Sequence, residues 1–114
     1  SGAAHHILGL RDGRLVCTWG NRHDPSILAA VSEDRGLTWD TTRGWPLREG
    51  QHLSEHGLRP YIGRRGGDVV KLPLTDIGET CSTQLPNGRV MTAYYWANGD
   101  DDPMRYIEAA IYTV

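Results

Sequence analysis

The segment Ser32-Glu33-Asp34-Arg35-Gly36-Leu37-Thr38-Trp39 has the residue order of a tight turn between two β-strands. Asp34 can accept hydrogen bonds from backbone N–H groups of the turn that follows it, and Gly36 can adopt the positive φ that such a turn needs. Thr38 begins the return strand, and Trp39 is placed to fold beneath the turn. Because the apolar run Ile27 to Val31 leads into it, the segment predicts a β-hairpin anchored by an aromatic side chain.

Alternating apolar and polar residues predict further strands on both sides of this hairpin. We expect strands over 5–10, 14–19 and 26–33, with Trp39 and residues 45–47 in an outer fourth strand, and a second set over 77–85, 89–97 and 105–114. The turns Arg11-Asp12-Gly13 and Pro86-Asn87-Gly88 are of the kind that joins hairpin strands. Between the two sets, residues 48–76 lose this periodicity, and we expect an insertion or a long loop with one strand-like run at 68–74.

The second half of the chain repeats the first. The segment Leu10-Arg11-Asp12-Gly13-Arg14-Leu15 matches Leu85-Pro86-Asn87-Gly88-Arg89-Val90, and each precedes an alternating strand with an aromatic residue near its end. A repeat of short strands joined by tight turns indicates an all-β fold. The 14 glycines and 6 prolines among 114 residues agree with many turns.

Charge and composition exclude several kinds of partner and site. Twelve basic and 14 acidic residues give a net charge of −2 without a long block of either sign, so we expect no nucleic-acid or membrane partner. No apolar run is long enough to cross a membrane, and the first residues lack the features of a signal peptide, so the sequence indicates no compartment. Cys17 and Cys81 lie in separate strand-like runs, which favours packed thiols over a zinc site and leaves a disulfide possible by count.

Two groups of side chains contain residue types that occur as metal ligands. His52 and His56 have helical i, i+4 spacing, but Gly50 and Gly57 bracket them and favour a loop. The run Asp100 to Asp102 is typical of a solvated acidic turn. We therefore expect no bound metal and no cofactor.

The spacing Ser-x-Asp-x-Gly-x-Thr-Trp resembles the Asp-box, a hairpin signature of sialidase (neuraminidase) β-propellers, also called BNR repeats. Together with Ile7 to Leu15, Gln84 to Arg89, Tyr94 to Trp96 and Arg105 to Ile107, it resembles the C-terminal blades of bacterial members of that family. The resemblance implies a six-bladed propeller whose axial cleft binds a terminal sialic acid. Because the box lies at the blade periphery in that family, it also implies a structural role for five residues: Ser32, Asp34, Gly36, Thr38 and Trp39.

A four-stranded blade needs about 40 to 45 residues, so the chain is predicted to hold about two blades. We expect one partial propeller domain over 1–114, with a first blade at about 5–48, an insertion loop at about 49–76 and a second blade at about 77–114. Two blades cannot close a ring. The expected partners are therefore missing propeller blades or a second copy of the chain, besides a carbohydrate.

The resemblance also points to site residues. In sialidases, arginines clamp the substrate carboxylate, a tyrosine paired with a glutamate attacks the anomeric carbon, and an aspartate serves as acid and base. Where the family has that tyrosine after a glycine, this chain has Gly78 followed by Glu79, so Glu79 is the candidate catalytic carboxylate. Arg22 is the candidate ligand-binding arginine.

These observations support two hypotheses. The first is a sialidase-like glycoside hydrolase portion that acts on terminal sialic or related acidic sugars and is inactive as an isolated chain. The second is a non-catalytic carbohydrate-binding or scaffold module. The missing tyrosine favours the second, whereas Arg22 in a cleft-side loop favours the first.

Overall fold

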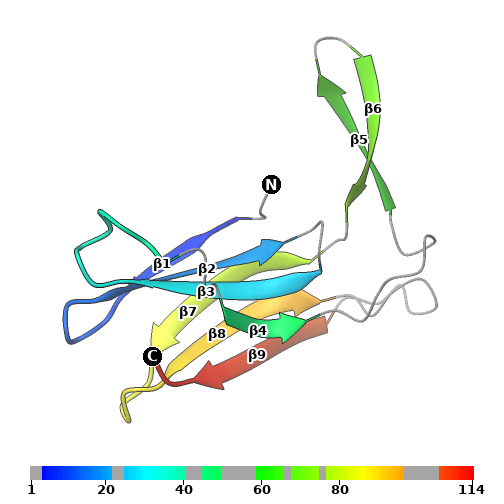
Figure 1. Ribbon diagram of the computed structural model, residues 1–114. Coiled ribbons are helices and arrows are strands. Elements are labelled where there is room, and N and C mark those ends of the chain that lie inside the picture. Colours follow the sequence, from blue (N-terminus) through cyan, green and yellow to red (C-terminus); the bar gives the residue numbers. More distant parts are fainter. Residues whose placement is uncertain are drawn as a thin grey trace.

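The computed structural model describes residues 4–21, 25–40, 45–49, 59–65, 68–74, 77–96 and 106–114, with the backbone alone for 59–65 and 68–74. These residues form strands and turns and contain no helix, in agreement with the predicted all-β class. The first sheet has the order β1-β2-β3-β4, and the second has the order β7-β8-β9, both antiparallel (Figure 1). The strand bounds are β1 His6–Gly9, β2 Leu15–Asn21, β3 Ser26–Ser32, β4 Trp45–Glu49, β5 Arg59–Arg65, β6 Asp68–Leu74, β7 Gly78–Gln84, β8 Val90–Trp96 and β9 Tyr106–Tyr112.

The strands β5 and β6 correct the expected long loop. They pair antiparallel as a separate two-stranded sheet, from Arg59 opposite Leu74 to Arg65 opposite Asp68. Gly66 and Gly67 are the two residues between the paired ends, and a Gly-Gly pair between two strand-like runs is a known hairpin signal. The scattered glycines and charges concealed this signal in the sequence.

The fourth strand also differs from its prediction. The strand β4 begins at Trp45 and pairs with β3, whereas Thr38, predicted to start the return strand, and Trp39 both lie outside every strand. The Trp39 indole Nε1 donates a hydrogen bond to the Gly36 carbonyl at 3.2 Å. Because this bond holds Trp39 against its own turn, it belongs to the turn and not to the outer strand.

The two sheets pack face to face (Figure 1). The kind of side chain between them changes from one edge to the other. The strand β7 lies against β1 and β2, where small hydroxyl groups meet: Thr18 Oγ1 is 3.1 Å from Ser82 Oγ. Toward β4 and β9 the side chains are large. There Trp96 lies beneath the Arg48 guanidinium, 4.8 Å from the ring centre, and Arg48 Nε donates to Glu108 at 3.1 Å. Hydroxyl groups therefore meet between β2 and β7, and aromatic and charged side chains meet beside β4 and β9.

The repeat seen in the sequence is also a repeat of structure. In the first turn the Leu10 N–H donates to the Arg14 carbonyl, and in the second the Leu85 N–H donates to the Arg89 carbonyl, both at 2.8 Å. Gly13 and Gly88 have φ values of 92° and 87°. The strand registers also correspond, since Ile7 pairs with Cys17 in the first sheet and Ser82 pairs with Thr92 in the second.

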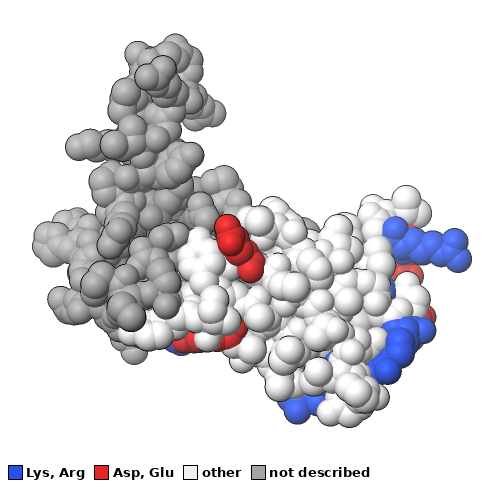
Figure 2. Space-filling model, turned by 180° about the vertical axis from the view of Figure 1, so that it is seen from behind, with Lys and Arg blue, Asp and Glu red and all other residues white. Residues whose placement is uncertain are grey.

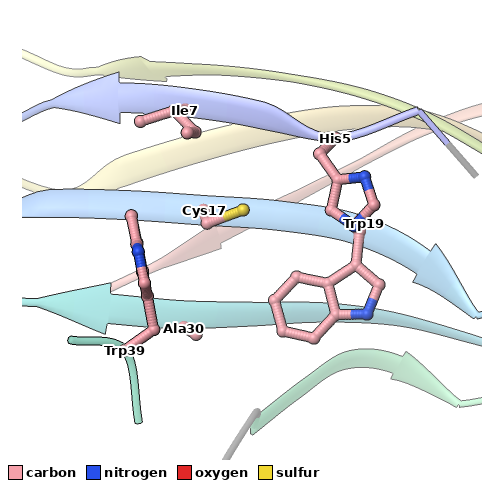
Figure 3. A pocket seen from close by; sticks show the side chains of 6 residues that line it. All are labelled: His5, Ile7, Cys17, Trp19, Ala30 and Trp39. Atoms are coloured by element: carbon pink, nitrogen blue, oxygen red, sulfur yellow. The ribbon is translucent and has the colours of Figure 1, made fainter. Parts of the chain in front are cut away.

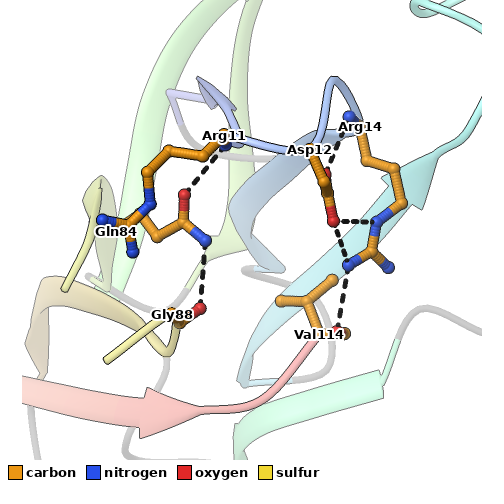
Figure 4. A network of polar contacts seen from close by, with 6 residues as sticks. All are labelled: Arg11, Asp12, Arg14, Gln84, Gly88 and Val114. Carbon is orange, nitrogen blue, oxygen red and sulfur yellow. Dashed lines mark hydrogen bonds and ion pairs between the residues drawn. The ribbon is translucent and has the colours of Figure 1, made fainter. Parts of the chain in front are cut away.

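The two repeated turns contact one another. The Arg11 guanidinium donates to the Leu85 carbonyl at 2.6 Å. The Arg11 backbone N–H donates to Gln84 Oε1 at 2.9 Å (Figure 4). Arg14 bonds to Asp12 and also to the Val114 carbonyl at 3.2 Å. These contacts align the ends of the two sheets. In Figure 2, the described Arg side chains gather toward this turn end, and much of the face in view is uncharged.

The repeats meet through opposite faces. Val16 is fully buried against the second sheet, whereas Met91, its counterpart in the second repeat, faces away from the first sheet. Conversely, Thr92 is buried and bonds to Ser82, whereas its counterpart Cys17 lies on the outward face of the first sheet. The contact is therefore heterologous: each repeat presents a different face to the other.

The burial of the two cysteines differs from the prediction that both thiols are packed inside the protein. Both are free, with Cys17 half-buried and Cys81 exposed. Cys81 lies between Thr80 and Ser82, which are buried toward the first sheet, so strand alternation directs Cys81 outward.

The described residues include no helix long and apolar enough to cross a membrane.

Candidate functional site

The predicted Asp-box segment forms a turn organised by the Asp34 carboxylate. Its Oδ1 accepts hydrogen bonds from the Thr38 N–H and the Ser32 hydroxyl, both at 2.8 Å, and its Oδ2 accepts one from the Thr38 hydroxyl. The Ser32 hydroxyl in turn accepts the Gly36 N–H at 2.8 Å. The expectation that Asp34 accepts a backbone N–H from the turn is thus confirmed. Gly36 has a φ of 88°, as expected, and Arg35 has a φ of 60°.

These bonds change the acidity of Asp34. The Thr38 hydroxyl contributes most, followed by the Thr38 N–H and the Ser32 hydroxyl, and together they lower the pKa of Asp34 to about 2. A carboxylate that its own turn keeps ionised carries no proton near neutral pH, so it cannot act as a general acid there. The geometry fits a structural turn and offers no catalytic group.

The turn and Glu79 lie at opposite ends of the packed sheets. Ser32 pairs with Leu15 at the start of β2, beside the Arg11 turn. Glu79 lies near the start of β7, where Gly78 pairs with Tyr95 at the far end of β8. The Asp34 turn therefore cannot share a site with Glu79.

Glu79 has an unusual backbone conformation. Its side chain is exposed and its φ is 49°, while the preceding Gly78 has a φ of 129°. The register between β7 and β8 shifts between Gly78 and Cys81, which marks a β-bulge. Thr80 fixes the strand immediately after the bulge, because its hydroxyl donates to the Thr18 carbonyl at 2.9 Å. A non-glycine residue with positive φ in a bulge is a costly conformation that often occurs at functional sites.

The second candidate, Arg22, lies outside the described residues. Its neighbour Asn21 ends β2, the strand that lies against β7. Since Thr18 of β2 bonds to Thr80, the end of β2 and the start of β7 lie at the same end of the sheets. The histidines His52 and His56 and the acidic run 100–102 also lie outside the described residues. Among the described side chains, no group of three His, Cys, Asp or Glu could hold a metal ion.

Sequence reasoning missed an apolar pocket on the outward face of the first sheet. Its volume is about 420 Å³, and its walls are His5, Ile7, Cys17, Trp19, Ala30 and Trp39 (Figure 3). The His5 and Trp19 rings are stacked with their centres 6.1 Å apart. The signal was present in β2 and β3, whose largely apolar runs are typical of strands covered on both faces.

The pocket offers little reactive chemistry. Its titratable side chains are His5 and Cys17, and burial raises the pKa of the Cys17 thiol. A protonated thiol is a poor nucleophile and a poor metal ligand. The pocket is thus suited to apolar contact, and Glu79 at the end of the sheets remains the candidate for polar recognition.

Comparison of the chain with models of known protein families finds no match, and comparisons with curated proteins and with solved structures find none either.

Proposed function

We propose that this chain forms two neighbouring blades of a sialidase-like β-propeller and supplies one wall of a cleft for acidic sugars. The support for blades is the heterologous contact between the repeats, since repeated units that meet through opposite faces continue into a ring when the rotation closes. The change from hydroxyl contacts between β2 and β7 to aromatic contacts beside β4 and β9 gives the two edges of the packed sheets different contents, as in sheets arranged around an axis. The Asp-box turn fits a position away from the cleft.

The observation that carries the sugar-binding role is the bulge that turns Glu79 outward. It places an exposed carboxylate at the end of the sheets opposite the Asp-box, next to the end of β2. A carboxylate accepts hydrogen bonds from sugar hydroxyl groups. An acidic sugar also needs a guanidinium fork for its own carboxylate, and Arg22, directly after β2, is the residue we propose for that role.

Hydrolysis makes further demands. Cleavage of a sialoside requires a carboxylate clamp, an activated nucleophile and an acid/base residue in one cleft, and general acid–base catalysis alone contributes about 10² to 10⁴ in rate. Glu79 stands in the place of the family's tyrosine. We therefore propose binding without turnover for the isolated chain.

The second candidate function is a scaffold module that binds no sugar. The observation in its favour is the apolar character of the outward sheet face, which suits protein contact better than a polar ligand. The two candidates differ in whether an acidic sugar interacts with residues near Glu79.

An NMR titration separates them. With N-acetylneuraminic acid we expect amide shifts at the end of β2 and the start of β7, which weaken in Arg22→Ala and persist in the control Arg35→Ala. Arg35 is an exposed arginine in the Asp-box turn, at the opposite end of the sheets. Shifts that a neutral sugar reproduces equally, or no shifts at all, would reject the acidic-sugar cleft.

A fluorogenic aryl sialoside tests catalysis in the same preparations. We expect no release of the fluorophore by the parent chain or by Glu79→Tyr at any pH. Clear turnover by the parent that is lost in Glu79→Gln would instead make Glu79 a catalytic carboxylate.

A further inference from the structure

Apolar side chains are exposed on the outward faces of both packed sheets. The first outward face, on the first sheet, consists of His5, Ile7, Cys17 and Trp19, together with Ala30, which is only 1% exposed, and has Trp39 at its border. The second outward face, on the second sheet, consists of Cys81, Met91, Ala93, Ile107 and Ile111. Ile7 is 58% exposed, Ile107 80% and Ile111 47%. Exposed apolar surface of this kind marks interaction sites.

Because the two sheets are repeats, each outward face can be compared with the inward face of the other sheet. Strand pairing makes Ile107 the counterpart of Ile27, because Ile107 lies opposite Tyr95 and Ile27 lies opposite Gly20 at the equivalent position of the first sheet. Ile27 is fully buried against the second sheet. In the same way, Ile111 is the counterpart of Val31, which packs against the shared core. The second outward face therefore repeats the surface that the first sheet presents inward.

The first outward face shows the reverse correspondence. Trp19 is the counterpart of Tyr94, which is buried between the sheets. Ile7 is the counterpart of Ser82, which is buried and contacts Thr18. This face thus repeats the surface that the second sheet presents inward.

We propose that the first outward face of one copy of this chain docks onto the second outward face of another copy, in a head-to-tail contact. Each molecule carries both halves of the contact that already joins its two sheets, so a second copy continues an interface that exists within the chain. Both halves are apolar, and the pocket beside Trp19 can receive side chains such as Ile107 from the partner copy. The inference goes beyond the sugar-binding proposal, because it depends only on the equivalence of the two repeats.

Sedimentation velocity over a range of concentrations tests this contact. We expect the parent chain to associate, and expect Ile7→Asp and Ile107→Asp each to weaken association by about tenfold or more, because each places a charge in an apolar contact. Leu37→Asp is the matched control, since Leu37 is 85% exposed in the Asp-box turn and belongs to neither outward face. A parent chain that is monomeric at every concentration would overturn the proposal, as would equal weakening by the control.

Mixing the two variants tests the head-to-tail geometry. Ile7→Asp keeps an intact second outward face, and Ile107→Asp keeps an intact first outward face, so the mixture is expected to form a 1:1 dimer that grows no further. A symmetric contact between identical faces predicts no such rescue. Failure of the folded variants to form the mixed dimer would refute the head-to-tail arrangement.

Cross-linking of the parent chain gives a second test that needs no variant. Cys17 lies on the first outward face and Cys81 on the second, and both thiols are free. In a mixture of ¹⁵N-labelled and unlabelled chains, a short bismaleimide is expected to link Cys17 of one copy to Cys81 of another. Intermolecular links that join only like cysteines would contradict the proposal.

Discussion

Replacing Ile27 and Ile107 by alanine, each in its own variant, compares the same residue type at equivalent positions of the two repeats. Ile27 is fully buried in a cluster with Ile77, Tyr94 and Trp96. Ile107 is 80% exposed on the second outward face. The two substitutions remove the same atoms from the same kind of strand, so their difference measures the packing between the sheets and not the β-propensity of isoleucine.

The structure sets the expected magnitudes. Alanine lacks three carbon atoms of the isoleucine side chain, and at about 0.8 kcal/mol for each buried carbon the transfer loss at Ile27 is about 2.4 kcal/mol. The cavity that remains adds to this loss, so Ile27→Ala is expected to cost about 2 to 5 kcal/mol of unfolding free energy. At Ile107 only a fifth of the residue is covered, and the same calculation predicts about 0.5 kcal/mol.

Urea denaturation followed by tryptophan fluorescence measures both losses. The experiment belongs at low micromolar concentration, where association of the chain contributes least, and the slopes of the transitions must agree for the midpoints to be compared. Equal losses in the two variants, or a loss at Ile27 below about 1 kcal/mol, would refute the packed inner face.

Two further predictions concern the Asp-box turn. Thr38→Val removes the strongest bond to Asp34 and should raise the pKa of Asp34 from about 2 toward 3.8, as measured by carboxyl ¹³C shifts, whereas Thr83→Val, at an exposed strand position, should leave it unchanged. Because folding lowers this pKa, the associated stability is full above about pH 4 and is lost as the pH falls through about 2. In acid unfolding of Thr38→Val this component should be smaller, because the Thr38 N–H and the Ser32 hydroxyl still bond to Asp34. Trp39→Ala should cost about 1 to 3 kcal/mol in thermal unfolding, less than full truncation of a buried tryptophan because Trp39 is half-buried, and an unchanged melting temperature would contradict its role as the anchor of the turn.

Features set by local turn chemistry could be predicted from the sequence. Asp12-Gly13 and Asn87-Gly88 identify two hairpins because each side chain bonds to the N–H two residues on and each glycine accepts a positive φ. The turn at Asp34 follows from the same chemistry. The hairpin of β5 and β6 had a comparable signal in Gly66-Gly67, but irregular flanking residues hid it.

The contact between the sheets could not be predicted in the same way. The bonds from Arg11 to Leu85 and from Thr80 to Thr18 join residues that are far apart in the chain, and single-residue preferences carry no record of such partners. The sequence does show that β2 and β3 are apolar on both faces. It therefore indicates that other parts of the protein cover both faces of this sheet, but it does not identify which element covers each face.

Within the candidate site, the backbone conformation of Glu79 is the feature that was least predictable from the sequence. A glutamate has no preference for positive φ, so nothing in the residue itself signals the conformation that the structure gives it. The conformation follows from its surroundings: Gly78 turns the chain, the register shifts, and the bond from Thr80 to Thr18 restores the strand beyond the bulge. A strand that followed a regular register here would avoid the cost of this backbone. Because the surrounding structure holds an exposed carboxylate in this conformation at the end of the sheets opposite the Asp34 turn, the bulge is the strongest structural reason to look for ligand binding at Glu79.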